Sequence, residues 1–256
     1  MVAGVVAEVS PSMRSHLRRH LPPLFEIAFL ATGGYADALL QLRFVVNEAV
    51  ARSVSGPDES AVRRELVSIL VRGLEERLGG RTERSFEDLD TLLRSDITRP
   101  IELGADPLGN DPRRIEIMLW HLKRTCMVAM LGALPISLRL AVILTDLSGF
   151  DPPDAAALLG INERAYRVRL TRARKRLESY AAPRCQHVDP DNPCTCVGRL
   201  AIAMDAGFVA YPADAETLPK TPHDTAPPKR AMAALLATLP LPRLRDEDVT
   251  SLLSAV

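Results

Sequence analysis

The stretch GINERAYRVRLTRARKRLE, from Gly160 to Glu178, decides the fold of this chain and raises the question of what it binds. Between Arg164 and Arg176 it carries seven cations and no carboxylate. The whole chain of 256 residues has 32 basic and 32 acidic side chains and therefore no net charge. A local basic patch on a neutral protein is sufficient to bind phosphate, so the total charge does not exclude nucleic acid as a ligand.

A helix over this stretch separates its apolar residues from its cations. If the helix begins near Asn162 or Glu163, spacings of four, three and four place one apolar face against the preceding helices. The cations repel one another along the helix, whereas a phosphate backbone relieves that repulsion and guanidinium groups also read guanine edges. A solvated basic face with no partner is the alternative. The predicted apolar face is Tyr166, Leu170, Ala173 and Leu177, and the predicted DNA-binding residues are Arg164, Arg167, Thr171, Arg172, Arg174 and Lys175.

The residues before this helix complete a helix-turn-helix pattern. Pro135 begins one predicted helix that runs to Phe150, and Pro152-Pro153 open a short one, PPDAAALLG. Gly160 then turns the chain sharply into the basic helix. In such motifs the first turns of the second helix enter the major groove of DNA, which is where the basic run falls.

The remaining sequence is also typical of helices. Aromatic residues make up only 4% of the chain, while Leu, Ala and Arg are abundant. Residues 14–54 predict two helices broken at Thr32–Gly34, and a further helix opens at Pro57-Asp58 and stops at Gly79-Gly80. An amphipathic helix follows Pro112. Its apolar stripe is Ile115, Leu119, Leu122, Cys126 and Met130.

We therefore predict an all-α fold of two small helical domains joined by a linker. The first domain covers 1–80, and the linker covers 81–112 with one short helix started by Ser85 and Asp88. The helix-turn-helix domain covers 113–180. A Cys-rich element (181–200) and a Pro/Ala-rich tail (201–256) follow, the tail with short helices in KRAMAALLATL and RDEDVTSLLSAV.

The segment LPISLRLAVILTDLSGFDPPDAAALLGINERAYRVRLTRARKRLESY resembles region 4 of the extracytoplasmic-function sigma factors of bacterial RNA polymerase. The resemblance implies a sigma factor whose region 4 contacts the −35 promoter element and the polymerase flap. It implies promoter DNA and core polymerase as partners, and it allows an anti-sigma factor. The matching positions are Leu134-Pro135, Arg139, Gly149, Ala156, Leu159–Ile161 and Arg169–Arg174.

The N-terminal half departs from the pattern of that family. In the family one helix of this half binds the polymerase and another, basic and aromatic, melts the −10 element. Here Leu39 and Leu40 stand where acids are usual, and residues 61–81 hold five arginines but no Trp or Tyr to hold a flipped base. Two alternatives therefore stay open: a DNA-binding regulator without sigma activity, and a metal or thiol sensor that acts through protein contacts.

The segment PRCQHVDPDNPCTC gathers thiols and an imidazole within twelve residues. The turn Asp189–Pro193 would bring its ends together. Thiolates with one imidazole suit zinc or copper, so we predict a metal site, which would be either structural or regulatory. Free thiols and a reversible disulfide are the alternatives; some sigma factors that this chain resembles end in a Cys-rich element and respond to metals. The predicted ligands are Cys185, His187, Cys194 and Cys196.

Other functions find little support in the sequence. No nucleophile elbow, phosphate loop or carboxylate pair stands out, so we expect no enzyme and no catalytic residues. No targeting segment and no apolar run long enough to span a membrane is recognisable, which predicts a cytoplasmic protein. The remaining histidines have no paired partner in the sequence and are interpreted as surface or packing residues: His16, His20, His121 and His223.

Overall fold

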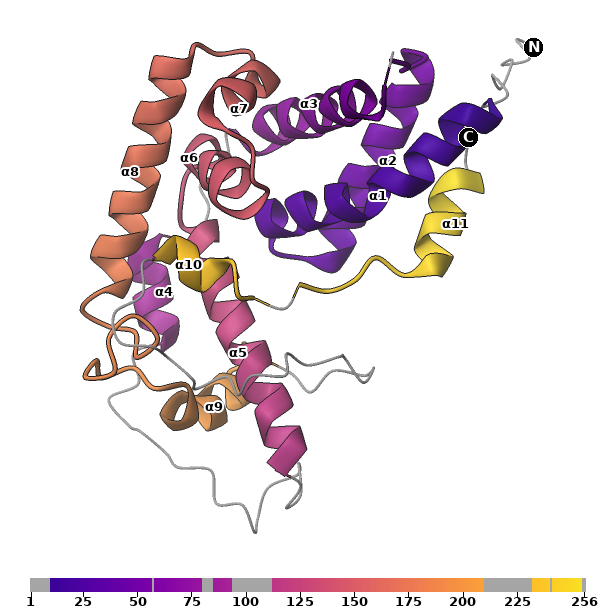
Figure 1. Cartoon of the computed structure of the whole chain (residues 1–256). Helices are drawn as coiled ribbons and strands as arrows, with labels where there is room; N and C mark the ends of the chain where they lie inside the picture. Colours follow the sequence, from indigo (N-terminus) through magenta and orange to yellow (C-terminus); the bar gives the residue numbers. More distant parts are fainter. Residues whose placement is uncertain are drawn as a thin grey trace. The chain divides into compact units, whose positions relative to one another are not determined.

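The computed structural model is all-α and describes residues 10–56, 58–79, 85–93, 112–209, 232–239 and 241–254. The predicted fold class is confirmed, and Figure 1 labels the elements. The N-terminal half holds α1 (Pro11–Thr32), α2 (Tyr35–Ala51), α3 (Glu59–Leu78) and α4 (Phe86–Leu93). The C-terminal half holds α5 (Pro112–Gly132), α6 (Ile136–Val142), the π-helical turn η1 (Ile143–Leu147), α7 (Pro152–Leu159), α8 (Glu163–Ala181), α9 (Cys196–Asp205), α10 (Met232–Leu236) and α11 (Asp246–Ser254).

The ends of the N-terminal helices follow from capping residues that the sequence displays. Gly33 takes the left-handed conformation (φ 80°) that closes α1, because glycine adopts it without steric cost. The Asp58 side chain accepts a hydrogen bond from the Ala61 amide at 2.8 Å and so starts α3. Ser85 and Asp88 bond to each other reciprocally at the start of α4. The predicted helix breaks and the short linker helix are confirmed.

The described residues form two compact units through which the chain passes more than once. Unit 1 consists of 1–81, 139–169 and 242–256, and unit 2 consists of 82–138 and 170–241. Within unit 1, α7 and η1 pack against α3 and α1, and within unit 2, α5 packs against α9. The predicted domain boundaries stay a prediction, and the middle of the predicted linker, 94–111, lies outside the described residues.

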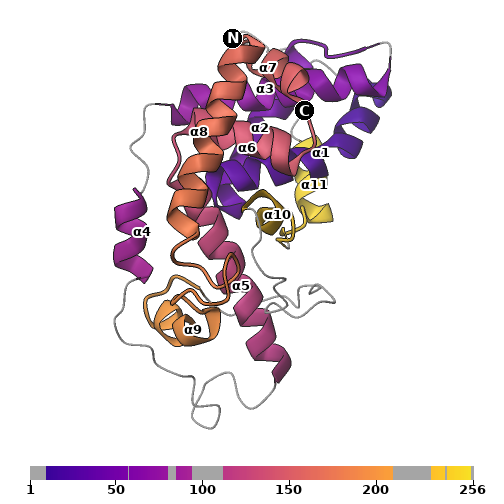
Figure 2. The ribbon, with the colours of Figure 1, turned by 60° about the vertical axis from the view of Figure 1, so that its left-hand side comes forward.

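Unit 1 is a helical bundle around α1, α2 and α3. Its core side chains, such as Leu17, Leu42 and Leu70, are fully buried. The C-terminal α11 lies beside α1 and α2, and α7 lies beside α3 (Figures 1 and 2). Arg139 is buried in this unit and donates a hydrogen bond to the Ala31 carbonyl. Burial lowers the pKa of Arg139 to about 10, so this side chain still carries its charge at neutral pH.

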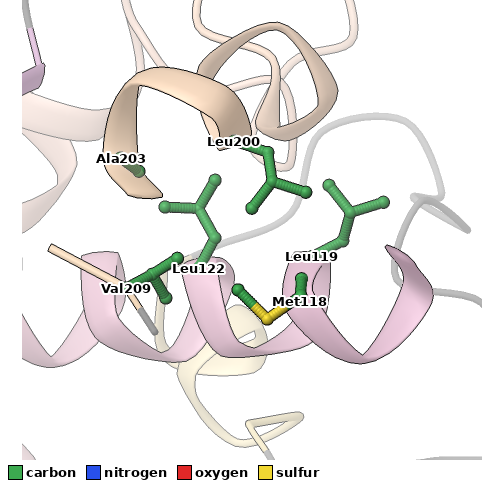
Figure 3. Packing of buried hydrophobic residues seen from close by; sticks show 6 residues of the cluster. All are labelled: Met118, Leu119, Leu122, Leu200, Ala203 and Val209. Atoms are coloured by element: carbon green, nitrogen blue, oxygen red, sulfur yellow. The ribbon is translucent and has the colours of Figure 1, made fainter. Parts of the chain in front are cut away.

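Unit 2 contains the contact that docks the Cys-rich element and its following helix. Helix α9 packs along α5, as Figure 2 shows. The Thr195 side chain accepts from the Gly198 amide at 3.1 Å, which starts α9 where the Cys-rich segment ends. Figure 3 shows the interface from close by. Its buried core is Met118, Leu119, Leu122, Leu200, Ala203 and Val209.

In the described part of the chain, none of the helices combines the length and the apolar character that crossing a membrane requires.

Candidate DNA-binding surface and cysteine element

The helix-turn-helix is built from capping residues around Gly160. The Asp151 side chain accepts from the Asp154 amide at 2.9 Å and starts α7. Gly160 ends α7 in the left-handed conformation, with φ 66°. Asn162 then accepts from the Ala165 amide at 2.8 Å, so α8 begins at Glu163, where the sequence predicts it. The predicted motif is confirmed.

The helix before the motif ends differently from the prediction. The sequence predicts one helix from Pro135 to Phe150, but α6 widens into the π-helical turn η1. There the Ser148 amide donates to the Ile143 carbonyl, five residues back, at 2.8 Å. Gly149 (φ 74°) then turns the chain toward Asp151.

The two faces of α8 are those that the apolar spacing predicts. Tyr166, Leu170, Ala173 and Leu177 are all at least 95% buried. The Tyr166 hydroxyl donates to the Ala141 carbonyl at 2.9 Å, which fixes the rotation of the first turns of α8. On the other face the predicted DNA-binding residues are all exposed to solvent: Arg164, Arg167, Thr171, Arg172, Arg174 and Lys175.

Arg167 and Arg169 of α8 pair with carboxylates. Arg167 forms an exposed ion pair with Glu163 at 2.6 Å, one turn before it. An exposed pair of this kind contributes well under 1 kcal/mol, so DNA can displace it. Arg169, by contrast, is only partly exposed and bonds to Glu75 of α3 at 2.8 Å. Arg169 therefore serves packing within unit 1.

Helix α3 contacts the helix-turn-helix through its polar side chains. Ser68 and Arg72 both donate to the Leu158 carbonyl at the end of α7, at 3.1 and 3.3 Å. The Arg63 guanidinium lies 5.0 Å from the centre of the Phe150 ring. Arg63 and Arg72 belong to the five arginines of residues 61–81, so in unit 1 two of these cations face the motif.

The C-terminal half of α8 borders a basic cavity of about 630 Å³. The rings of Phe86 and Tyr180 stack on each other with centroids 4.6 Å apart. Tyr180 also donates to Asp90 at 2.9 Å, and together with burial this interaction raises the pKa of Tyr180. The concave, cationic wall extends the exposed face of α8 and suits phosphate. Its lining is Phe86, Arg172, Lys175, Arg176, Ser179, Tyr180 and Arg184.

The Cys-rich segment folds back on itself as the turn residues predict. The backbones of Cys185 and Cys194 pair in an isolated β-bridge, while both thiols are free. In this bridge the Gln186 amide donates to the Cys194 carbonyl at 3.2 Å. The Asn192 side chain closes the turn by donating to the Ala182 and Cys185 carbonyls at 2.6 and 3.0 Å. The backbone thus brings the ends of this segment together.

The predicted metal ligands are close to one another but not in one coordination sphere. His187 is buried, and its Nε2 lies 3.2 Å from Cys196 Sγ. Cys185 and Cys194 line a cavity of about 450 Å³ together with Cys126 of α5. Among the described residues, no three of these ligand atoms lie within 4.8 Å of one another. The metal site therefore stays a prediction.

The sequence places Cys126 on an apolar helix face, from which it could approach the Cys-rich element. It is a free thiol, like the other cysteines. Burial raises the pKa of Cys126 well above its ordinary value, and the neighbouring Cys185, Cys196 and Cys194 raise it further. Burial also raises the pKa of Cys185. Both thiols are therefore protonated at neutral pH, and a metal would have to displace their protons.

A helix-turn-helix with an exposed row of cations on its second helix is typical of DNA-binding proteins. Comparison with known families indicates which kind of helix-turn-helix this is. Residues 124–177 match the family model described as Sigma-70, region 4. The "ECF RNA polymerase sigma factor SigE" of Mycolicibacterium smegmatis (strain ATCC 700084 / mc(2)155) is 27% identical over 176 residues. Residues 124–177 are thus similar to region 4 of the sigma-70 family, and the chain is similar to an extracytoplasmic-function sigma factor.

The likeness does not extend over the whole of these proteins. The match to SigE covers 67% of this chain and 62% of the relative, so the chain spans less than two thirds of that protein. A solved structure of the sigma factor RpoE in complex with the anti-sigma factor NepR, from Bartonella quintana, is 22% identical with a TM-score of 0.44. That match covers 68% of this chain and 98% of that chain.

Proposed function

We propose that this protein is a sigma factor that directs RNA polymerase to selected promoters, with the helix-turn-helix at the −35 element. The observation that carries the proposal is the exposed cationic face of α8, which stands on the second helix of a region 4 domain. Phosphate contacts by such a face position a protein on DNA, and the first turns of the helix read base edges. The protein would act in the cytoplasm as a transcription factor rather than as an enzyme.

Core RNA polymerase is the proposed protein partner, and α2 is the element that would contact it. Leu40 of α2 is 60% exposed, which is unusual for a large apolar side chain of a helical bundle. The family resemblance implies that this helix binds the polymerase. An anti-sigma factor is a further partner that the family allows.

A binding assay with purified core polymerase tests this partner. We expect the full chain to bind the core, and Leu40→Asp to weaken that binding at least tenfold while leaving DNA binding unchanged. Because Leu40 is exposed, the substitution should not alter folding, which circular dichroism checks. Failure of the unaltered chain to bind core polymerase would favour the second candidate function.

That second candidate is a DNA-binding regulator without sigma activity. It is favoured by the engagement of Arg63 and Arg72 with the helix-turn-helix in unit 1 and by the lack of Trp or Tyr over residues 61–81. A chain of this kind would bind its sites as the sigma factor does but would neither recruit polymerase nor open DNA.

Sequence-specific recognition should depend on the first turns of α8. We expect Arg167→Ala to weaken binding to the preferred promoter more than binding to random duplex, because a bidentate contact to a base contributes roughly 1–3 kcal/mol of discrimination. Arg176, more than two turns further along, should contribute through phosphate alone. Arg176→Ala is therefore the matched control and should weaken binding to both duplexes equally. An equal loss in Arg167→Ala would mean that Arg167 does not face the bases.

The cysteine element is proposed to hold a zinc or copper ion that adjusts promoter activity. The donor set fits, since thiols and one imidazole are the ligands that these metals prefer. Cys185, Cys194, Cys196 and His187 would hold the ion. Cys126 is available as an additional thiol because it lines the same cavity as Cys185 and Cys194. The ion would tie down the segment that leaves α8 at Tyr180.

The double substitution Cys194→Ser with Cys196→Ser tests this element. Reduced protein prepared without chelator should lose about one equivalent of zinc or copper relative to the unaltered chain, because two thiolate ligands are gone. Elemental analysis measures the loss. If the ion is regulatory, transcription from a cognate promoter should change as well; unchanged transcription would make it structural. Equal metal content in both proteins, or a disulfide between these cysteines in the unaltered chain, would exclude the site.

A further inference from the structure

Two imidazoles and a carboxylate converge in unit 1, far from α8 and the cysteine element in the sequence. His16 and His20 lie on α1, and Glu59 is the first residue of α3. Among the described residues, these are the ones whose potential ligand atoms form a trio within 4.8 Å. The expectation that His16 and His20 have no paired partner is therefore wrong. Their partner comes from a different helix, about forty positions away, which local sequence spacing cannot reveal.

The geometry of the trio is set by two rigid helices. His16 and His20 are four residues apart and so lie on the same side of α1. The Asp58 cap fixes the start of α3 and with it the position of Glu59. His16 Nδ1 lies 3.3 Å from Glu59 Oε2, and His20 Nε2 lies 2.7 Å from Glu59 Oε1. Ligands about 2.0–2.1 Å from a tetrahedral zinc ion are separated by about 3.3 Å, close to the first of these distances.

The buried member of the trio is polar and poorly satisfied. His20 is only 6% exposed, which is rare for a histidine without a strong partner. Although Nε2 is close to Glu59 Oε1, neither atom has a hydrogen-bond partner of adequate geometry. The contact is thus an approach of two polar atoms rather than an aligned N–H···O bond. A cation bound to both atoms from one side, with the two atoms moved slightly apart, would use both lone pairs.

We propose that His16, His20 and Glu59 form a zinc-binding site that clamps α1 to the start of α3. Two imidazole nitrogens and one carboxylate are a ligand set that zinc takes in proteins, whereas calcium and magnesium prefer oxygen alone. The half-exposed His16 and Glu59 give the ion access from solvent. The site is separate from the cysteine element and does not depend on sigma activity.

Arg19 would compete with the zinc ion for the Glu59 carboxylate. Its guanidinium lies 3.1 Å from Glu59 Oε2 and competes for the same oxygen. The Arg19 side chain is 65% exposed, so it can turn into solvent when a metal enters. Arg63 adds a weaker positive field at His20. Removing the Arg19 charge should therefore strengthen zinc binding. In a plain ion-pair cluster of Arg19, His16, His20 and Glu59, the same change would only remove one stabilising pair.

Zinc titration of the full chain with all four cysteines replaced by serine tests the proposal, because thiol sites then do not contribute. We expect about one equivalent to bind, with the thermal unfolding midpoint rising as zinc is added, since a ligand that binds only the folded state stabilises it. His16→Gln, at a half-exposed position, and Glu59→Gln should each weaken zinc binding at least tenfold. If the cysteine-free chain is unstable, the same histidine and glutamate variants are compared in the Cys194→Ser, Cys196→Ser chain.

The Arg19→Gln variant gives the discriminating result. It should bind zinc two- to fivefold more tightly than its parent, and cobalt bound in its place should show ligand-field bands without thiolate charge transfer. Absence of zinc binding, or binding that His16→Gln and Glu59→Gln leave unchanged, would overturn the proposal and leave the trio as an ion-pair cluster.

Discussion

Replacing Arg172, Arg174, Lys175 and Arg176 together by glutamine should weaken binding of the full chain to duplex DNA by about a hundredfold or more near 0.1 M salt. Each cation that meets a phosphate releases a counterion, so removing several of them lowers the affinity and its salt dependence together. The slope of log affinity against log salt should become less steep by about 3 to 4. Fluorescence anisotropy over a range of salt concentrations measures both quantities.

A matched control removes the same number of charges elsewhere. Arg18, Arg43, Arg52 and Arg243 are all exposed and lie outside α8. Their replacement by glutamine should change the net charge equally but leave the salt slope nearly unaltered. Equal losses in the two variants would mean that DNA binds to a diffuse charge distribution rather than to α8.

Leu200→Ala should lower the free energy of unfolding of unit 2 by about 2–5 kcal/mol. Leu200 is fully buried between α9 and α5, and truncating a buried leucine loses both its transfer free energy and the packing around the cavity that remains. Thermal or urea unfolding measures the change. Figure 3 shows that Leu200 of α9 lies against Leu119 and Leu122 of α5.

Val197 provides the control on the same helix. It is 48% exposed, so Val197→Ala should change stability by less than about 0.5 kcal/mol. If Leu200→Ala proved equally neutral, α9 would not be docked on α5.

The sequence predicted those features that depend on local chemistry. The breaks at Gly33 and Gly160 and the caps at Asp58 and Asn162 are visible because each serves a backbone group within a few residues of itself. The buried face of α8 is visible for the same reason, since Tyr166 and its partners recur at helical spacing. The exposed cations follow as the complement of that face.

The features that the sequence did not reveal depend on contacts between distant segments. Nothing near Arg169 shows that it pairs with Glu75 of α3, because the two residues are distant in the sequence. The π-helical turn at Ile143–Leu147 is likewise hidden. Its hydrogen bonds span one residue more than those of an α-helix, but the spacing of the apolar residues still predicts a helix. A histidine pair at i and i+4 was the available signal for the trio with Glu59.

Reconstituted transcription is the most direct test of the central claim that this chain is a sigma factor. Purified core RNA polymerase is incubated with the chain and with promoter templates selected by their binding to it, and specific transcripts are counted. We predict initiation at defined start sites that requires the chain and is lost in the quadruple glutamine variant of α8. Specific binding to those templates without any chain-dependent transcript from the core would contradict the claim and assign the protein to the regulators that bind DNA but do not initiate.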